Sequence, residues 1–436
     1  MSGLVELLDW LDGHLDHETG SLGVAAGKVD GLDLVSMREL MHVLGDPQAA
    51  QPVVHVTGTN GKGSVATMLT ALFMAHGLTV GTATSPHLER LAERIRRNGA
   101  PISDEELAEA LDGVRQVEPL LSRRPTWFEI VVAASLRYFA EAPVDLAVVE
   151  VGLLGRYDAT NVVDAAVSVV TSIGGDHTDF AEGWELAIAS EKAGILRHDG
   201  TAVLGEVDPA LWGVFEAEGP ERLWCAGRDF GVGDDQVAIG GHVVDIDGVH
   251  GVYPEVFVPL HGAHQAANAA VAVAAAEGFF GRELDPDAVR EGFASVEVPG
   301  RCEVVRHHPL VVLDGAHNPD ALHALALTVD DEFAVVGSRY LVVGALGGRD
   351  PERLVRAASA IRPDLVVCVP VGSGVRAGDP EELARAWRAT GTAVETASSV
   401  DGGIDRVRSV ALDEDLVVVA GSFRLLDDAR RAFARD

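Results

Sequence analysis

Lysine is scarce in this sequence: Lys28, Lys62 and Lys192 are the only three among 436 residues. Arginine carries most of the positive charge, and 67 acidic against 34 basic residues give a formal net charge of −33. A surface of this sign repels the phosphates of nucleic acids and anionic lipids. We therefore expect neither a nucleic acid nor a membrane as partner. An anionic substrate would need a local positive pocket or metal ions.

Cysteine and long apolar runs are also lacking. Cys225, Cys302 and Cys368 are an odd, scattered set that fits neither a disulfide framework nor a zinc site, so we expect buried free thiols. No apolar run reaches the length needed to span a bilayer. Residues 1–16 are acidic and amphipathic, unlike a signal peptide. A cytoplasmic location is the resulting expectation.

The length and the order of apolar segments predict an α/β protein of more than one domain. A chain of 436 residues is too long for one ordinary core. Nearly continuous apolar strands alternate with helical segments, which indicates a parallel sheet covered on both faces. Residues 201–260 are richer in glycine and in short alternating runs, which predicts antiparallel strands there. The α/β alternation restarts near 298–300, so we expect domains at 1–297 and 298–436.

The hydrophobic periodicity also assigns individual elements. Helices are expected at 4–16, 34–45, 103–121, 127–139, 264–280, 319–330, 351–361, 380–389 and 424–433. Strands are expected at 53–56, 79–83, 144–151, 166–173, 310–313, 340–344, 364–369 and 415–420.

The most informative stretch is residues 53–64, Val-Val-His-Val-Thr-Gly-Thr-Asn-Gly-Lys-Gly-Ser. A β-branched run leads into a glycine-rich turn, and an apolar helical segment follows. A strand, a glycine turn and a helix start form a cradle whose backbone N–H groups face an anion. Lys62 would reach the outer phosphates and Ser64 would ligate Mg²⁺. Gly63 departs from the strict G-x-x-x-x-G-K-S/T pattern, and an ordinary glycine turn is the alternative.

Charged groups follow two other strands of the first domain, where α/β sheets place ligands. Glu150 ends the strand at 144–151, and a carboxylate there could bind Mg²⁺ near phosphates. His177 follows the strand at 166–173 and could contact a metal or a phosphate. Lys192 lies in an apolar helical stretch, and its ammonium would be repelled by Mg²⁺ unless its charge were altered. Solvated or salt-bridged surface groups are the alternatives for all three.

The second domain offers Asp314 and His317 around a turn after its first strand. An Asx-type turn punctuated by Asn318 and Pro319 is the alternative interpretation. Arg301, just past the expected domain boundary, could reach a nucleotide phosphate or could be an ordinary surface arginine.

Taken together, these segments resemble folylpolyglutamate synthase, which is often bifunctional with dihydrofolate synthase, within the Mur ligase superfamily. The matching motifs occur in the family's order from about residue 34 to 423, namely 55–64, 84–88, 93–95 with 98–99, 126 with 128–129, 150–152, 158–161, 176–179, 191–195, 264–265 with 268–269, 299–301, 314–319 and 421–422. Several motifs in order are far more specific than any one of them alone.

The resemblance implies a P-loop-type, mostly parallel ATPase domain followed by a smaller Rossmann-like α/β domain. It also implies an ATP-dependent ligase that phosphorylates the carboxylate of a pterin substrate, after which the amino group of L-glutamate displaces phosphate. The implied cofactors are ATP and two Mg²⁺ ions, and the implied state is a monomer. A carboxylate is a poor electrophile, so such activation agrees with the chemistry.

Site roles follow from the resemblance, motif by motif. The resemblance assigns ATP contacts to Thr59, Asn60, Gly61, Lys62, Gly63, Ser64, Asn268, Arg301 and Asp314. One Mg²⁺ is implied at Ser64 and Glu150, and a second at Glu150, His177 and Lys192, the lysine being carbamylated in this family. The implied catalytic residues are Lys62, Lys192, Asp314 and His317. The pterin side is assigned to Ser85, Phe128 and Glu129, and glutamate handling to His317 and Asp314.

Two positions depart from the family pattern. Leu154 replaces a glycine after the strand glutamate, which puts the turn near the metal in question. Residues 348–350 read Gly-Arg-Asp where the family often has an Asp-Lys-Asp-like stretch. Two other functions are alternatives. A muramyl ligase more often has threonine directly after the lysine and carries a further N-terminal domain. A non-catalytic P-loop nucleotide-binding protein would not need Asp314 and His317.

Overall fold

The computed structural model describes residues 2–16, 24–25, 28–29, 33–176, 178, 180–372 and 378–433. The chain separates into two compact units. The first comprises Met1–Gln236, Val243–Pro259 and Gln265–Val296, and the second comprises Val237–His242, Leu260–His264 and Glu297–Asp436. The second unit thus includes two short segments that precede residue 297. The division into domains at 297/298 stays a prediction.

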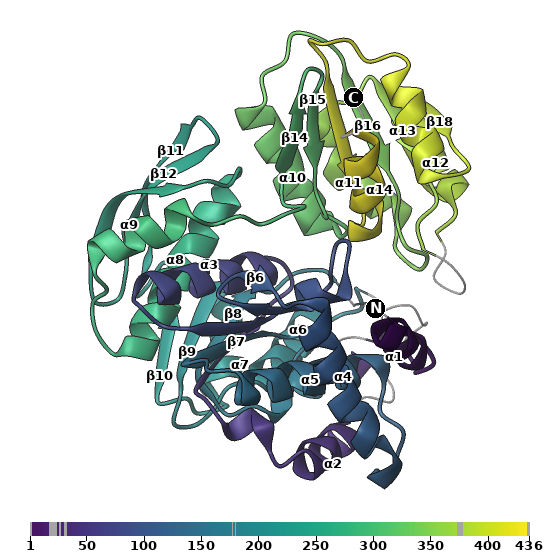
Figure 1. Cartoon of the computed structure of the whole chain (residues 1–436). Helices are drawn as coiled ribbons and strands as arrows, with labels where there is room; N and C mark the ends of the chain where they lie inside the picture. Colours follow the sequence, from purple (N-terminus) through teal and green to yellow (C-terminus); the bar gives the residue numbers. More distant parts are fainter. Residues whose placement is uncertain are drawn as a thin grey trace. The chain divides into compact units, whose positions relative to one another are not determined.

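The first unit is built on an eight-stranded sheet (Figure 1). Its spatial order is β10 (Arg222–Cys225), β9 (Thr201–Glu206), β8 (Ala165–Ser172), β3 (Val53–Thr57), β7 (Leu146–Glu150), β4 (Val80–Ala83), β5 (Ile95–Arg97) and β6 (Ala100–Pro101). The first six strands are parallel, and only β5 and β6 at one edge are antiparallel. All residues of β3 and β7 are buried, as expected for central strands covered on both faces.

Helices cover both faces of this sheet. In one set, α1 (Ser2–Asp12), α2 (Val35–Val43), α4 (Asp104–Val117) and α5 (Trp127–Glu141) share one large apolar core. The same set includes α6 (Trp184–Ala193) and α7 (Trp212–Glu216), which form a second apolar core with β8 and β9. The other set comprises α3 (Lys62–Ala75), α8 (Ala263–Phe280) and α9 (Pro286–Ala294). Helix α8 has almost no polar side, because nine alanines and valines along it are fully or nearly fully buried.

The region 201–260 corrects one expectation. Strands β9 and β10 are parallel members of the large sheet, so the prediction of antiparallel strands is wrong for 201–206 and 222–225. Strand β10 lies at the edge of the sheet, and its residues run from exposed at Arg222 to buried at Cys225, so its sequence lacks the continuous apolar run of a central parallel strand. The separate sheet β11 (Gly231–Ala238), β12 (Gly241–Asp247), β13 (Val252–Val258) has tight connections, which only antiparallel neighbours allow.

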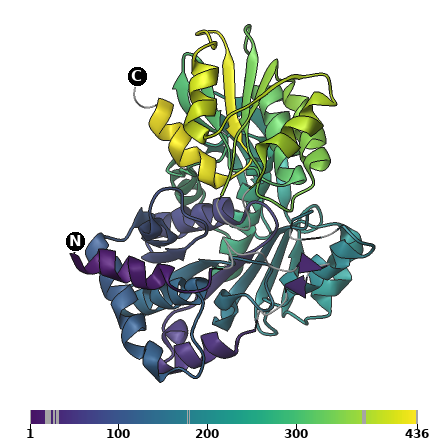
Figure 2. The ribbon, with the colours of Figure 1, turned by 90° about the vertical axis from the view of Figure 1, so that its right-hand side faces the viewer.

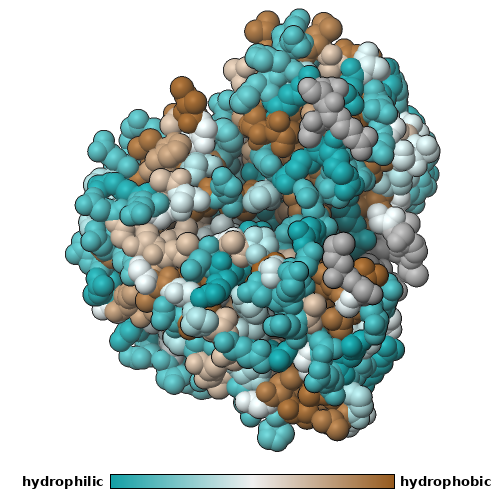
Figure 3. All heavy atoms as spheres, in the orientation of Figure 1, coloured by the Kyte–Doolittle hydropathy of each residue, from teal (hydrophilic) through white to brown (hydrophobic). Residues whose placement is uncertain are grey.

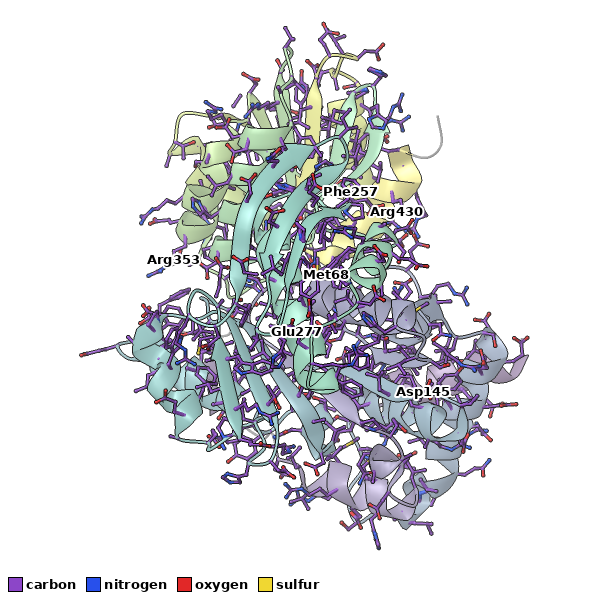
Figure 4. The ribbon with its side chains drawn as sticks, turned by 90° about the vertical axis from the view of Figure 1, so that its left-hand side faces the viewer. Met68, Asp145, Phe257, Glu277, Arg353 and Arg430 are labelled. Carbon is purple, nitrogen blue, oxygen red and sulfur yellow. The ribbon has the colours of Figure 1, made fainter. Side chains whose placement is uncertain are left out.

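A buried carboxylate fastens the β12–β13 hairpin to α8 (Figure 4). Glu277 on α8 accepts hydrogen bonds from the backbone N–H groups of Val249, His250 and Gly251 and from the hydroxyl of Tyr253, at 2.6 to 3.1 Å. Four donors satisfy this fully buried side chain. The hairpin is therefore anchored by α8 rather than by its turn residues alone.

The second unit is a smaller α/β sheet (Figure 2). Its order is β14 (Glu303–His307), β15 (Leu310–Leu313), β19 (Leu416–Ala420), β16 (Arg339–Val343), β17 (Leu365–Cys368) and β18 (Ala393–Thr396), and all neighbours except β14–β15 are parallel. Side chains of α10 (Pro319–Glu332), α11 (Pro351–Ala358) and α12 (Pro380–Arg388) form one core against the sheet. Helices α13 (Val400–Arg408) and α14 (Phe423–Phe433) contact each other and the strands.

Glu332 at the end of α10 explains why two distant segments belong to the second unit. Its carboxylate lies 2.9 Å from His242 Nε2 and 2.7 Å from His261 Nδ1, and it accepts the N–H of Gly262 at 2.6 Å. These donors hold the pKa of Glu332 below its ordinary value against the opposing effect of burial.

The remaining described strands are the short antiparallel pair β1 (Val24–Ala25) and β2 (Lys28–Val29). No described helix combines the length and the apolar character that a membrane crossing would require. The face shown in Figure 3 is largely hydrophilic, as expected for a chain with so many charged residues.

Candidate active site

The glycine turn after β3 has the form of an anion cradle. Gly61 adopts φ +85° and immediately precedes Lys62, the first residue of α3. A side chain at position 61 would also collide with Asn268, because its Cβ would come within 2.5 Å of Asn268 Oδ1. Glycine is therefore required there on two grounds. The first N–H groups of α3 have no intrahelical acceptor and can serve a ligand.

Hydroxyl groups at the end of β8 support this turn from the neighbouring strand. Ser172 Oγ accepts the N–H of Asn60 at 3.0 Å, and Thr171 Oγ1 donates to the carbonyl of Asn60. Thr59 Oγ1 donates to the carbonyl of Gly174 and accepts its N–H. The turn is thus held before any ligand arrives, which reduces the entropy that binding would have to remove.

Lys62 folds back over the turn. Its Nζ donates to the carbonyl oxygens of Gly58 at 3.0 Å and Thr59 at 3.3 Å. The ammonium therefore lies beside the backbone of the cradle, where it can exchange carbonyl partners for phosphate oxygens.

Glu150 and Ser64 come together at the carboxyl edge of the sheet. Glu150 ends β7 beside β3 and is 4% exposed, and Ser64 in the first turn of α3 is 1% exposed. A Cβ on Gly63 would lie 3.6 Å from Glu150 Oε2, which places this carboxylate against the start of α3. Glu150 Oε2 also accepts the N–H of Ser85 at 3.0 Å. A buried carboxylate and a buried hydroxyl beside a phosphate cradle are ligands that Mg²⁺ accepts.

Lys192, near the end of α6, is buried at the same edge. Burial and, to a smaller extent, the positive charge of Lys62 lower its pKa to about 7, against the opposing effect of Asp176 and Asp158. Within the described part of the chain its Nζ makes no hydrogen bond or ion pair, so the salt-bridged alternative is not what the structure has. The structure thus brings together the two motif lysines expected from the sequence.

The loop after Glu150 keeps a glycine-like conformation despite Leu154. Leu154 has φ +59°, its carbonyl accepts the hydroxyl of Thr57 at 2.6 Å, and its side chain is buried beside Ile188 and Trp184 of α6. The left-handed conformation is unfavourable for a leucine. Packing against the helix that carries Lys192 offsets it.

A buried polar network lies beneath this loop. Asp158 accepts the N–H groups of Leu153 and Thr160 and the hydroxyl of Thr160, and Thr160 Oγ1 lies 2.9 Å from His55 Nε2. Because the Thr160 hydroxyl donates to Asp158, His55 must donate through Nε2, which leaves Nδ1 as the neutral acceptor. Burial lowers the pKa of His55 to about 3.

The three residues expected on the pterin side have different surroundings. Ser85 touches Glu150 as described, and Phe128 packs on Gly152, where an added Cβ would come within 2.3 Å of its ring. Glu129 instead closes the start of α5: its carboxylate accepts the N–H of Thr126 at 2.7 Å, and its N–H donates to the Thr126 hydroxyl. This capping box occupies the Glu129 carboxylate with the helix, and its substrate role stays a prediction.

Arg301, Asp314 and His317 belong to the second unit. Both Asp314 oxygens accept backbone N–H groups, from Cys302 at 2.7 Å and Ala316 at 2.6 Å. The Asx-type turn considered from the sequence is therefore present. By holding the N–H of Cys302, Asp314 also fixes the residue next to Arg301.

The Arg301 guanidinium lies over the ring of Phe423, 4.5 Å from its centroid. The same ring fills the space beside Gly315, where a Cβ would come within 2.4 Å of it. Phe423 thus orients Arg301 through a cation–π contact. His317 Nδ1 lies 2.8 Å from the carbonyl of Gly315, and Asn318 Oδ1 caps α10 by accepting the N–H of Ala321.

Several supporting residues were not identified from the sequence. The sequence does contain a signal for Thr171 and Ser172, because these two polar residues end an otherwise apolar strand. The signal for Phe423 is weaker and consists of its position directly after the Gly421–Ser422 motif. A cation–π pair between residues 122 positions apart follows no spacing rule.

The donor set agrees with Mg²⁺ held largely by a substrate. His177 lies outside the described residues, and among those described no group of three or more His, Cys, Asp or Glu could hold a metal ion. Ser64 and Glu150 would supply two oxygen ligands to such an ion, and Mg²⁺ characteristically takes its other ligands from phosphates and water.

Comparison with known proteins agrees with this geometry. The Mur ligase middle domain matches residues 56–276, and the Mur ligase glutamate ligase domain matches residues 300–423. A dihydrofolate synthase/folylpolyglutamate synthase of Mycobacterium tuberculosis is 40% identical over 92% of this chain and 90% of its own length.

Two solved structures share the whole fold. Mycobacterium tuberculosis folylpolyglutamate synthase complexed with ADP has a TM-score of 0.91 and 36% identity over 100% of this chain and 99% of that one. A bifunctional folylpolyglutamate synthase/dihydrofolate synthase with Mn, AMPPNP and L-glutamate bound has a TM-score of 0.84 and 29% identity over 98% of both chains. The chain therefore belongs to the folylpolyglutamate synthase/dihydrofolate synthase family of the Mur ligase superfamily.

Proposed function

We propose that this protein is an ATP-dependent ligase that joins L-glutamate to the carboxylate of a pterin substrate, as in folate polyglutamylation, in conversion of dihydropteroate to dihydrofolate, or in both. The observation that carries the proposal is the grouping of Lys62, Ser64, Glu150 and Lys192 at one edge of the large sheet. ADP, AMPPNP, Mn and L-glutamate in the related structures support ATP, a divalent metal and glutamate as ligands here.

In this proposal the cradle from Thr59 to Ser64 binds the phosphates of ATP. Asn268 fixes the turn at Gly61, and Lys62 neutralises charge on the transferred phosphoryl group. Bound Mg²⁺ supplies further positive charge, with Ser64 and Glu150 as its protein ligands and a second ion at Glu150, His177 and Lys192. Phosphoryl transfer requires positioning and charge neutralisation more than covalent participation of the protein.

The two chemical steps balance without any further reactant. The substrate carboxylate attacks the γ-phosphorus of ATP, which releases ADP and forms an acyl phosphate. The glutamate amine then attacks the acyl carbon, phosphate leaves with the C–O electron pair, and the amine loses a proton as the amide forms. We assign Arg301 and Asp314 to ATP, and His317 with Asp314 to glutamate. Ser85, Phe128 and Glu129 are assigned to the pterin.

Lys192 would serve its metal as a carbamate. An unprotonated amine adds CO₂ and releases one proton, which converts a cation into an anionic ligand. A pKa of about 7 leaves a substantial fraction of the amine unprotonated at neutral pH and supports this assignment. A monomeric state and a cytoplasmic location remain predictions.

Mass spectrometry of the products tests the function. The protein is incubated with ATP, Mg²⁺ and L-glutamate, and with dihydropteroate or tetrahydrofolate as acceptor. We expect at least one acceptor to gain a glutamyl residue, with one ADP and one phosphate released per amide. A muramyl peptide precursor is the matched control acceptor. Glutamylation of neither pterin, or phosphate release driven by the muramyl precursor, would refute the proposal.

A further inference from the structure

A hollow of about 340 Å³ lies at the side of the large sheet opposite to the cradle, where the parallel strands begin. It is lined by Arg38, Asp46, Gln48, Asn161, Asp164 and Arg197, among others. Gln48 precedes β3, and Asn161 and Asp164 precede β8, so these residues lie at the amino ends of strands whose carboxyl ends carry the cradle. Its size is in the range of small-molecule sites.

Two guanidinium groups line this hollow, and carboxylates neutralise their charge only in part. The guanidinium of Arg38, an exposed residue of α2, makes no hydrogen bond or ion pair among the residues that the structure describes. Arg197 donates to Asn161 Oδ1 and to the carbonyls of Val163, Ile195 and Leu196, and its Nε lies 3.5 Å from Asp164. The Asp164 side chain is 87% exposed, so water screens this pair. Burial lowers the pKa of Arg197, Asp164 opposes this effect, and the positive charge of Arg38 adds to it.

The hollow also contains an unused acceptor. Gln48 Oε1 is buried and has no hydrogen-bond partner, while Gln48 Nε2 donates to Asp46 at 3.1 Å. The amide cannot be turned around without placing its oxygen against the Asp46 carboxylate. A ligand that satisfies the site must therefore accept hydrogen bonds from arginine and donate one to Gln48.

We propose that this hollow binds a small oxyanion that carries its own hydroxyl donor, such as inorganic hydrogen phosphate, between the Arg38 guanidinium and Gln48 Oε1, with Arg197 contributing positive charge to the lining. The two carboxylates of the lining, Asp46 and Asp164, favour the protonated form of such an anion. Hydrogen phosphate has a P–OH group for Gln48, whereas sulfate has none at neutral pH. The site is separate from the cradle and does not depend on the proposed ligase activity.

The site contacts the helix that carries Lys192. Arg197 holds Asn161, and Asn161 Nδ2 donates to the carbonyls of Arg156 at 2.9 Å and Gly194 at 3.0 Å. Gly194 is the C-cap of α6. A bound anion would therefore hold the end of this helix through two hydrogen-bonded side chains.

Calorimetric titration with inorganic phosphate and with sulfate at constant ionic strength tests the proposal. The protein is first saturated with Mg²⁺ and AMPPNP to fill the cradle. We expect one phosphate per chain and weaker binding of sulfate. Arg38→Gln should weaken phosphate binding about tenfold or more, because a charge-assisted hydrogen bond is lost. Arg38→Lys should retain part of it.

Two further variants make the test specific. Gln48→Leu should remove the preference for phosphate over sulfate. Arg222→Gln changes an exposed arginine outside the hollow and should leave both affinities unchanged. Arg38 is not part of the cradle, so phosphate bound in an incompletely filled cradle would be the same in wild type and in Arg38→Gln. The difference in phosphate binding between the two proteins therefore reports on the hollow alone. Absence of phosphate binding at millimolar concentration, or equal binding by wild type and Arg38→Gln, would overturn the proposal.

Discussion

Lys192 lies in an environment very different from that of a surface lysine. It is buried, its pKa is lowered to about 7, and the chain has only two other lysines. We expect Lys192→Ala to lower kcat by about two orders of magnitude or more, as for other losses of preorganised charge. The KM for ATP should change much less, because Lys192 is assigned to the metal and not to the nucleotide.

Lys62→Ala is the matched comparison, since it removes the other lysine of the same edge. This variant should weaken ATP binding strongly, measured by titration with AMPPNP. Incubation of wild type with ¹³CO₂ should also give a carbamate signal in the NMR spectrum that Lys192→Ala lacks. Unchanged turnover in Lys192→Ala would show that the carbamate assignment is wrong.

His55 gives the stability of the protein a dependence on pH. Burial lowers the pKa of His55 to about 3, whereas an unfolded histidine titrates near 6.5. Below pH 6.5 the unfolded chain therefore binds a proton that the folded protein does not, and stability falls on acidification. The contribution of His55 between pH 7.5 and pH 5 is roughly 2 kcal/mol.

His55→Gln should reduce this loss, because glutamine can donate to Thr160 without titrating. Urea denaturation at several pH values measures it, and the exposed His323→Gln is the control that should leave the slope unchanged. If His55→Gln and wild type lost stability equally between pH 7.5 and 5, His55 would not be held neutral in the folded state.

The loop between β7 and the helical turn at Ala159–Val162 is the element in which Leu154 departs from the family pattern. Its Leu154 combines an unfavourable backbone conformation with a buried side chain. Leu154→Ala removes the packing and keeps the strain, so we expect a loss of about 2 to 5 kcal/mol. Leu154→Gly removes both and should be about 1 kcal/mol more stable than Leu154→Ala.

Denaturant titration of both variants measures the difference. A glycine variant less stable than the alanine variant would mean that the backbone conformation at position 154 costs a non-glycine residue no strain.

Elements with a strong periodic signal were predicted closely from the sequence. The strand expected at 53–56 is β3 at Val53–Thr57, and the helical segment expected after the glycine turn is α3 at Lys62–Ala75, because a buried strand and a glycine turn leave little choice of structure. Strand β18 and helix α13 were not predicted, since β18 is a partly exposed edge strand and α13 contains Gly402 and Gly403. Exposed edges carry less apolar patterning, so their sequences constrain them less.

The candidate site was predictable where residues follow strand ends. Glu150, Lys62 and Ser64 lie together because parallel strands bring their carboxyl ends to one edge. Contacts between distant side chains, such as Arg301 with Phe423 or His55 with Thr160, depend on packing that no local pattern encodes.

The whole molecule divides its proposed catalytic residues between two units. Lys62, Glu150 and Lys192 belong to the first, and Arg301, Asp314 and His317 to the second. Both sets are assigned to one reaction, so we expect ligand binding to draw the units together, as in other enzymes with split sites. Small-angle scattering should show a smaller radius of gyration with Mg²⁺, AMPPNP and a pterin acceptor than without ligands. An identical radius would contradict closure.

Isotope transfer tests the central claim most directly, because it follows the oxygen atom that an acyl phosphate must pass on. The pterin acceptor is prepared with ¹⁸O in its carboxylate and incubated with ATP, Mg²⁺, L-glutamate and the protein. We predict that each amide formed releases one phosphate containing a single ¹⁸O atom. Amide formation with unlabelled phosphate would contradict activation of the carboxylate by phosphorylation.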